Sequence, residues 1–256
     1  MKFPRLALEG SLFFAGLITV FALIYTFTKS NIPEKVRIPL PTAAPTINPT
    51  PTPTIISEKQ KRFILLDVPF TSQSPLGQWS DPRQQDGCEE ASSLMAVYWA
   101  KDIKIINKET ALREILNISA YEEKNYGSFQ DTSAEDTATR IIEGYFDYQK
   151  VKVVKNISIQ DILEEVEKRN LVIVPTNGQI LGNPYYTAPG PERHMLVIRG
   201  FDPKTNEFIT NDNGTRLGEL YRYKTTILYN GIRDYPTGNH PPIVKVEKNM
   251  IVVWKD

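Results

Sequence analysis

The stretch Gln84–Ala100, QQDGCEEASSLMAVYWA, contains Cys88, which is the only cysteine in the chain. A turn sequence, Asp86-Gly87, comes directly before this cysteine. After it, apolar residues recur at helical spacing, namely Ala91, Leu94, Met95, Val97 and Tyr98. Turn residues followed by this period indicate that a helix begins at or near Cys88.

The position of Cys88 at a predicted helix start has a chemical consequence. The first turn of a helix has unpaired backbone N–H groups and the positive end of the helix dipole, and both favour a thiolate over a thiol. The thiolate is the nucleophile, and the backbone N–H of the same residue can point at a developing oxyanion. The adjacent Glu89 and Glu90 oppose the thiolate, although screening weakens this effect if they point to solvent. The alternative interpretation is a small, inert, buried apolar residue.

The composition excludes several classes of function. The 256 residues include 30 Lys and Arg and 30 Asp and Glu, so the net charge is zero, which argues against a nucleic-acid partner. One cysteine excludes an intrachain disulfide and a cysteine-rich zinc site, and we expect neither a metal nor a cofactor. The chain has two histidines, His194 and His240, so Cys–His chemistry within it must use one of them.

Residues 1–29 are typical of a membrane-targeting segment. Lys2 and Arg5 lie in residues 1–10, and residues 12–27 form an uncharged apolar run of about the length that crosses a hydrocarbon core. The run ends without the small residues of a signal-peptide cleavage site, so we favour an uncleaved anchor at residues 11–29 over a cleaved signal peptide. The basic residues before it predict a single-pass cell-membrane protein with residues 1–10 in the cytoplasm and the bulk of the chain outside.

Residues 30–60 are interpreted as a linker. They are rich in proline and threonine, most clearly in the run PTPTPT at residues 49–54. Proline at this density favours extended polyproline II, which acts as a semi-rigid spacer of about 3 Å per residue. From residue 61 the composition becomes globular, so we expect one catalytic domain over residues 61–256.

The globular part is predicted to contain mostly helices in its first half and mostly strands in its second half. Three further helices are predicted at residues 107–116, 132–146 and 158–168, with Ser133 and Ser158 as N-caps. Short apolar runs predict strands at residues 63–70, 149–154, 171–174, 194–200, 207–211 and 250–254. Helices followed by hairpin-connected strands predict an α+β domain with a mainly antiparallel sheet.

One predicted hairpin brings reactive side chains together. A turn at residues 202–206 joins the strands at 194–200 and 207–211, which places His194 and Asp212 near the same end. A carboxylate there can fix the imidazole tautomer and leave the other nitrogen to accept the thiol proton. His240 precedes two prolines and has no carboxylate partner nearby in sequence, so we rank His194 above it. The alternative interpretations are a hydrogen-bonded strand-end histidine and a turn-forming aspartate.

Several spaced motifs together resemble a known family. These are VPFTSQ at residues 68–73, GCEEAS at 87–92, HMLVIRGFD at 194–202 and the pair Asn211-Asp212. They are similar to motifs of papain-fold cysteine peptidases, in the branch related to the bacteriocin leader-processing (double-glycine) peptidases. The resemblance covers roughly residues 65–254 and is far more specific than any single motif.

The resemblance implies a papain-like fold and a set of site residues. It implies a thiol nucleophile at Cys88, a general base at His194 and an orienting carboxylate at Asp212. It also implies a glutamine whose side-chain amide helps form the oxyanion hole. Domain-only members of the family have this glutamine in a V-P-x-x-x-Q run, which matches Gln73, and Gln85 is the second choice.

Three functions are compatible with these residues. The leading hypothesis is a membrane-anchored extracytoplasmic cysteine peptidase that acts on a peptide or protein, cell-wall peptides included. A papain-fold cell-wall amidase or acyltransferase would use the same three residues on a different carbonyl. A non-catalytic surface-binding module is the third, and it is disfavoured because the cysteine and histidine are both present. The sequence contains no G-x-x-x-x-G-K loop, so neither an ATPase domain nor bacteriocin export is implied.

Overall fold

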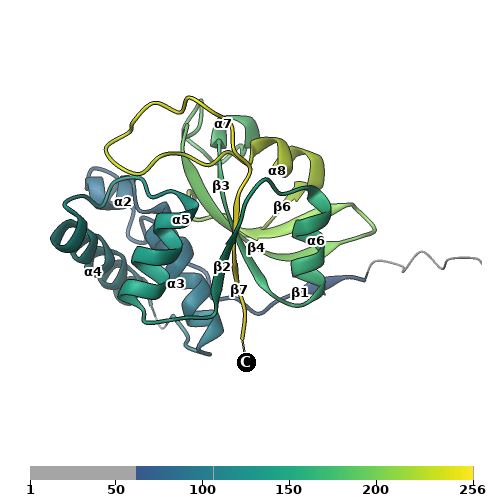
Figure 1. Cartoon of the computed structure of the whole chain (residues 1–256), viewed down its shortest axis with the longest axis horizontal. Coiled ribbons are helices and arrows are strands. Elements are labelled where there is room, and N and C mark those ends of the chain that lie inside the picture. The colour runs from purple at the N-terminus through teal and green to yellow at the C-terminus, as the bar shows by residue number, and fades with distance from the viewer. Residues whose placement is uncertain (1–61, 106, 256) are drawn as a thin grey trace, which may run out of the picture. The chain divides into compact units, whose positions relative to one another are not determined.

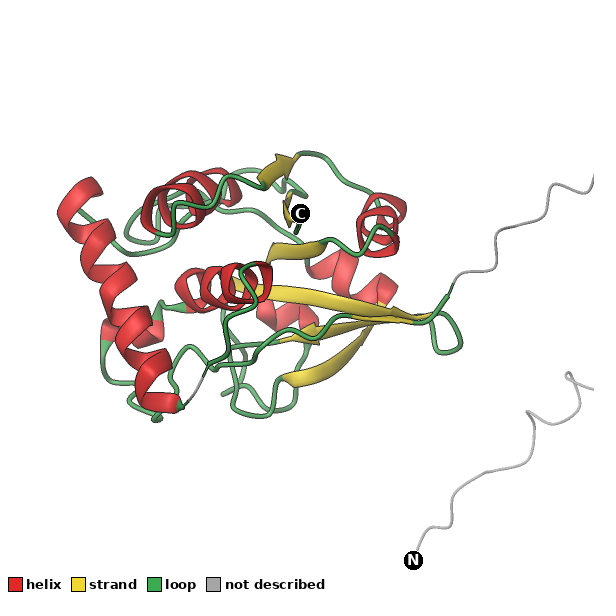
Figure 2. Ribbon diagram, turned by 90° about the horizontal axis from the view of Figure 1, so that it is seen from below, coloured by secondary structure: helices red, strands yellow, loops and turns green. Residues whose placement is uncertain are grey.

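The computed structural model describes residues 62–105 and 107–255, which belong to one compact unit spanning Ser57–Asp256. The predicted anchor at residues 11–29 and the linker at residues 30–60 lie outside the described residues. Within the described ranges, no helix is both long and apolar enough to cross a membrane. Helices from the first half of the described chain lie together on the left in Figure 1, and the strands spread out beside them (Figures 1 and 2).

The helical half carries the cysteine. Its elements are α2 (Pro82–Gln85), α3 (Cys88–Ala100), α4 (Lys108–Tyr126), α5 (Ala134–Asp136) and the π-helix η1 (Thr137–Tyr145). The prediction that a helix begins at Cys88 is confirmed. A glycine is required just before it, because a Cβ at Gly87 would lie 2.6 Å from the Arg83 carbonyl oxygen.

Two helices differ from the prediction. The helix predicted at residues 107–116 begins after its N-cap Asn107 but continues to Tyr126, and it ends where Gly127 adopts a left-handed conformation. The helix predicted at 132–146 is capped by Ser133 as expected, but it divides into α5 and η1. The Thr137 hydroxyl donates to the Ser133 carbonyl, and such a bond to the preceding turn competes with regular α-helix geometry.

The second half is dominated by one antiparallel sheet, which confirms the predicted α+β class. Its strand order is β2-β7-β3-β4-β5-β6, and β1 pairs with β4. The strands are β1 (Ile64–Leu65), β2 (Val151–Val154), β3 (Leu171–Thr176), β4 (His194–Asp202), β5 (Glu207–Asn211), β6 (Glu219–Lys224) and β7 (Met250–Val253). The predicted β4–β5 hairpin is present, with Asp202 opposite Glu207.

The sequence prediction made one strand of the described fold too long and missed another strand and two short helices. The strand predicted at residues 63–70 is only β1, because pairing with β4 is limited to Ile64 and Leu65. Strand β6 was missed because its side chains are mostly exposed and show no clear apolar alternation. The helices α7 (Gly178–Leu181) and α8 (Thr225–Gly231) were missed as well, whereas α6 (Ile159–Glu167) has the predicted Ser158 capping box.

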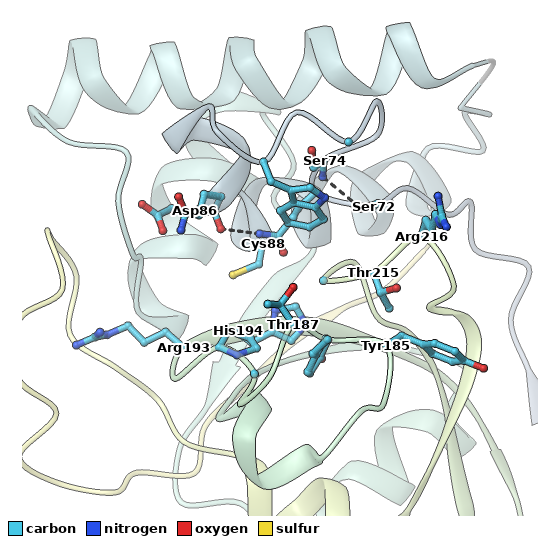
Figure 3. A pocket seen from close by; sticks show the side chains of 18 of the residues that line it. Ser72, Ser74, Asp86, Cys88, Tyr185, Thr187, Arg193, His194, Thr215 and Arg216 are labelled. Carbon is cyan, nitrogen blue, oxygen red and sulfur yellow. Dashed lines mark hydrogen bonds between the residues drawn. The ribbon is translucent and has the colours of Figure 1, made fainter.

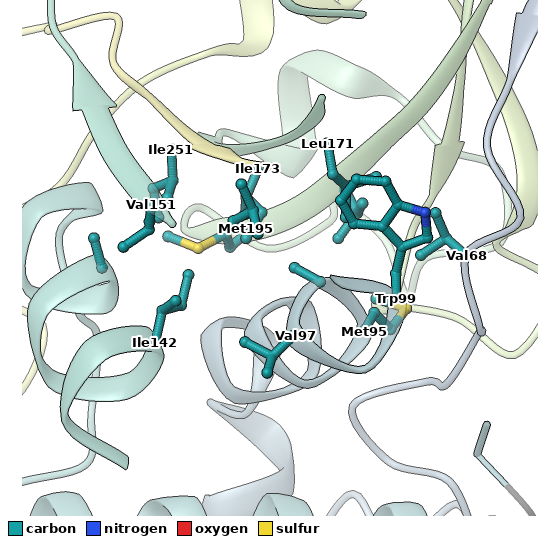
Figure 4. Packing of buried hydrophobic residues seen from close by; sticks show 14 of the residues in the cluster. Val68, Met95, Val97, Trp99, Ile142, Val151, Leu171, Ile173, Met195 and Ile251 are labelled. Carbon is teal, nitrogen blue, oxygen red and sulfur yellow. The ribbon is translucent and has the colours of Figure 1, made fainter. Parts of the chain in front are cut away.

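The central strands β3, β4 and β7 are buried on both faces. Alternate residues contribute to two hydrophobic clusters, one including Leu171, Ile173, Met195, Val197 and Ile251, the other Val172, Val174, Leu196, Ile198 and Val252. Helix α3 covers the first cluster, as Figure 4 shows, and α6 and α8 cover the second. Burial on both faces explains why these strands are continuous apolar runs rather than alternating ones.

Two glutamates are buried between α3 and α4, and neither forms a salt bridge in the described part of the chain. The Ser119 hydroxyl donates to one Glu90 oxygen, while the other Glu90 oxygen and both Glu122 oxygens have no hydrogen-bond partner among the described residues. Burial, with a contribution from the Glu89 charge, raises the pKa of Glu122 to about 9. Burial and the Glu122 charge likewise raise the pKa of Glu90 well above its ordinary value. With a pKa of about 9, the Glu122 carboxyl is protonated at neutral pH, and burial favours the protonated form of Glu90 as well.

We expect Glu122→Gln to stabilise the protein at alkaline pH, because the neutral amide removes the cost of holding a buried carboxyl whose pKa is raised to about 9. The folded pKa of Glu122 is raised, so its stabilising contribution is complete below the ordinary value of 4.5 and is lost as the pH rises towards about 9. Thermal unfolding of the parent and the variant from acid to alkaline pH checks this. Identical pH dependence of Tm in both proteins would contradict it.

Candidate functional site

A cleft of about 1050 Å³ lies between the helical half and the sheet. Cys88 lines it from the start of α3 and His194 from the start of β4, and Figure 3 shows them on opposite walls. The loop after α7 borders the cleft with Tyr185 and Tyr186. Gln73 lines the cleft as well, so segments far apart in the sequence meet here.

The Cys88 side chain is 5% exposed at the first turn of α3. Its thiol donates to Glu89 Oε2 at 3.0 Å and lies 4.0 Å from the Tyr235 hydroxyl. Burial, followed by the charge of Glu89 and its hydrogen bond, raises the pKa of the thiol well above its usual range. The sequence left open that Glu89 and Glu90 might face solvent, but both are buried, so screening does not weaken their effect.

His194 and Asp212 form the hydrogen-bonded pair expected from the hairpin. His194 Nε2 lies 2.9 Å from Asp212 Oδ1, and both side chains are buried. Asp212 is ionised and can only accept, so Nε2 carries a proton, and in the neutral form of the ring Nδ1 is the acceptor. Nδ1 makes no hydrogen bond to another residue in the described part of the chain, which leaves it available on the cleft side.

The Asp212 carboxylate is held by donors from three segments. Oδ2 accepts from Asn183 at 2.9 Å and from the Tyr186 and Tyr223 hydroxyls at 2.6 Å each, while the Gly214 N–H donates to Oδ1 at 3.1 Å. Burial raises the pKa of Asp212, but the His194 charge and these donors outweigh it and hold the pKa at about 2. The carboxylate is therefore a fixed negative partner for the imidazole throughout the physiological range.

Gly214 makes room for this arrangement. A Cβ at Gly214 would lie 2.9 Å from His194 Cε1 and 3.0 Å from Tyr186 Cε1, closer than real contacts allow. The Tyr186 ring packs edge-on against the imidazole, with centroids 5.6 Å apart. The glycine thus lets one loop approach the histidine closely while the tyrosine supports it.

Asn213 connects the nucleophile helix to the sheet. Its Nδ2 donates to the Cys88 carbonyl at 3.0 Å and to Ser92 Oγ at 2.8 Å. Ser92 Oγ in turn donates to the Met195 carbonyl at 3.1 Å, one residue after His194. This bridge fixes the position of the cysteine relative to the histidine. Nothing in the sequence identified Asn213, because its role depends on contacts between distant segments.

Gln73 lies on the cleft wall next to the chain that leads into α3. Its Nε2 donates to the carbonyls of Gln84 at 3.1 Å and Gln85 at 2.7 Å, while its Oε1 is buried without a partner in the described structure. Gln73 therefore also holds the entry to α3, a role not foreseen from the sequence. Gln85 itself lines the cleft but is exposed.

We expect Gln73→Ala to lower kcat by roughly 100- to 1000-fold, since it removes a dipole that stabilises charge developing in the transition state. KM should change less, because that charge is nearly absent in the ground state. Gln85→Ala is the matched control and should do little beyond perturbing the entry to α3. Steady-state kinetics, with Tm measured in parallel, distinguish them. A large loss in Gln85→Ala with intact turnover in Gln73→Ala would reverse the assignment.

A second Asp–His pair lies in the same cleft. His240 Nδ1 is 2.8 Å from Asp131 Oδ2, and Arg193 Nε is 3.2 Å from the same oxygen. The absence of a carboxylate near His240 in sequence was therefore misleading, because Asp131 reaches it from the loop before α5. His240 is about half exposed and also lies 3.8 Å from Asp86, whereas His194 is buried beside its aspartate. No hydrogen bond joins either histidine to Cys88 within the described residues.

The fold and the site define a class of α+β protein in which a thiol, an imidazole and a carboxylate share one cleft. A family model for the Peptidase_C39 like family matches residues 65–235, so the chain belongs to that family. Membership supports a peptidase of the cysteine type, and it confirms the resemblance noted from the motifs. The matched range contains Gln73, Cys88, His194 and Asp212, but not His240.

Two further comparisons are less informative. A Bacillus anthracis crystal structure described as a C39-like peptidase is similar at 14% identity with a TM-score of 0.47, covering 76% of this chain and 98% of that chain. Among curated proteins, no sequence matches this chain significantly.

Proposed function

We propose that this protein is a cysteine peptidase that hydrolyses peptide bonds with Cys88 as nucleophile, His194 as base and Asp212 as orienting group. The observation that carries the proposal is the buried 2.9 Å contact between His194 and Asp212, which leaves His194 Nδ1 without a partner among the described residues, in the cleft that Cys88 lines. Family membership supports the same assignment.

The proposed reaction follows from these positions. His194 Nδ1 accepts the thiol proton, and the thiolate attacks the scissile carbonyl to form a tetrahedral oxyanion. The backbone N–H of Cys88, left without an intrahelical acceptor at the start of α3, is the first proposed donor to that oxyanion. The Gln73 amide is proposed as the second donor, which requires its Nε2 to release one of the Gln84 and Gln85 carbonyls when substrate binds. The imidazolium then protonates the leaving amine, and water activated by His194 hydrolyses the thioester to free the acid and the thiol.

We also propose that the enzyme is anchored in the cell membrane and acts outside the cytoplasm. The uncharged run at residues 12–27 and the basic residues before it support this placement. A polyproline II linker at residues 30–60 would hold the catalytic domain up to roughly 90 Å from the anchor at about 3 Å per residue. The expected substrate is a peptide or protein segment at or beyond the membrane surface.

The anchor has a direct test. N-terminal sequencing of the mature protein from its host membrane should find residues before 30 still present. A mature N-terminus between residues 30 and 57 would instead indicate a secreted enzyme, without affecting the assignment of the site.

Thiol labelling of the full chain in detergent tests the catalytic proposal. A peptide-like electrophile should label the parent, fail to label Cys88→Ser, and label His194→Ala far more slowly. Equal labelling of the parent and His194→Ala would contradict the proposed base. Mass spectrometry of products from a peptide mixture distinguishes hydrolysis from acyl transfer, because a transferase would leave an amine attached to the new carboxyl end.

A further inference from the structure

The hydrogen bonding of the Cys88 thiol is directed away from the proposed base. The thiol donates to Glu89 Oε2 at 3.0 Å, and the Tyr235 hydroxyl lies 4.0 Å from the sulfur. A productive site needs the thiol proton to reach His194, whose Nδ1 is unpaired in the described structure. The resting thiol is thus held by a carboxylate that the reaction described above does not use.

Glu89 is organised to accept hydrogen bonds in a buried position. Its Oε1 accepts from the Tyr235 hydroxyl at 2.6 Å and from the Thr132 backbone N–H at 3.4 Å. The carboxyl is 2% exposed, and no salt bridge to a cation is found for it in the part of the chain that the structure describes. It is therefore fixed against the thiol on one side and against Tyr235 on the other.

The charges around Glu89 are mostly acidic. Glu90 follows it on α3, Glu122 approaches from α4, and Asp131 approaches from the loop before α5. Asp131 is partly neutralised by Arg193 and His240. An ionised Asp131 disfavours a further negative charge at Glu89 or Cys88, whereas the raised pKa values of Glu90 and Glu122 favour their neutral forms.

We propose that Glu89 is a positioning residue that holds the Cys88 thiol in a resting orientation, and that protonation of Glu89 releases the thiol towards His194. With Glu89 ionised, the thiol is a donor and the adjacent negative charge opposes the thiolate. With Glu89 neutral, that charge is gone and the carboxyl O–H can donate to the thiolate instead. The step consists of proton transfers only: Glu89 takes a proton from solvent, and the S–H bond of Cys88 breaks as its proton passes to His194 Nδ1.

The switch operates near neutrality. Burial, assisted by the Asp131 charge, raises the pKa of Glu89 to about 7. Acidification from slightly alkaline to slightly acidic pH therefore favours the released thiol. The effect of this release on catalysis rests on the proposed peptidase function. The effect on the chemical reactivity of the thiol does not depend on that function.

Alkylation of the full-length protein by iodoacetamide tests the proposal, because Cys88 is the only cysteine. At about pH 8, Glu89→Gln should react about tenfold faster than the parent, the effect of lowering a thiol pKa by about one unit. At about pH 5.5 the parent Glu89 is protonated and the two rates should converge. A slower reaction of Glu89→Gln at alkaline pH, or a rate ratio that does not change with pH, would overturn the proposal.

Two further variants separate positioning from a merely structural role. Glu90→Gln is the matched control, since Glu90 is equally buried on the next position but does not contact the thiol, and its rates should stay within about threefold of the parent. Tyr235→Phe removes a donor that favours ionised Glu89, so the inflection in the alkylation profile should move to higher pH. An unmoved inflection would contradict the proposal even if Glu89→Gln fails to fold.

A separate assay distinguishes a failure of the proposed Glu89 role from a failure of the proposed peptidase function. Peptide hydrolysis by the parent and His194→Ala is assayed separately. Absent hydrolysis together with the expected alkylation profiles would reject the peptidase while keeping the role of Glu89. Normal hydrolysis with a rate ratio independent of pH would reject the role of Glu89 alone.

Discussion

We expect His194→Ala to lower kcat by roughly 10⁴- to 10⁶-fold, the range found when the base of a nucleophile–base pair is removed. The imidazole is the acceptor that the geometry places in the cleft, with Nε2 bonded to Asp212 at 2.9 Å and Nδ1 without a hydrogen bond to any other described residue. Without it, a thiol whose pKa is raised by burial and by Glu89 stays protonated and is a poor nucleophile. Turnover of a cleaved peptide, with substrate KM measured alongside, checks this expectation.

His240→Ala is the matched control in the same cleft. It also removes an imidazole paired with a carboxylate, here Asp131 at 2.8 Å. His240 is about half exposed and has no contact with Cys88 among the described residues, so we expect a loss of less than about tenfold. A greater loss for His240→Ala than for His194→Ala would exchange the roles of the two histidines.

Asp212→Ala is expected to lower kcat by roughly 10⁴-fold, because the imidazole loses the group that fixes its tautomer. The same change should destabilise the fold by about 3–5 kcal/mol, the usual cost of removing one partner of a buried pair. It leaves His194, Asn183, Tyr186 and Tyr223 without the acceptor that they share. Kinetics and urea unfolding of one preparation measure both effects.

The matched control for this aspartate is Asp131→Ala, which removes the partner of His240 instead. It should cost far less activity, and a loss equal to that of Asp212→Ala would mean that the second pair also takes part in turnover. Asp212→Asn helps to separate orientation from folding, since its Oδ1 can still accept from His194. The pH dependence has a definite sign: the folded pKa of Asp212 is lowered, so its stabilising contribution is complete above the ordinary 3.8 and is lost as the pH falls towards about 2.

Local patterns were sufficient for much of the fold. The helix that begins at Cys88, the capping box at Ser158 and the β4–β5 hairpin all depend on residues a few positions apart. The hairpin in turn allowed His194 and Asp212 to be paired from sequence. Patterns failed where tertiary contacts decide, as in the short β1, the missed exposed strand β6 and the division of the helix at Thr137.

Taken by itself, the sequence determined the class of the domain, the single available thiol and the preferred histidine, because these depend on residue identity, periodicity and turn chemistry. Only the tertiary structure decided that Glu89 is buried against that thiol, that Asp131 provides His240 with a carboxylate, and that Asn213 binds the first turns of α3. It also decided that Gln73 reaches the chain before Cys88. Each of these contacts depends on how the helical half packs on the sheet, because that packing buries the groups concerned. Burial shifts the pKa of a carboxyl and gives a side chain a fixed hydrogen-bond partner.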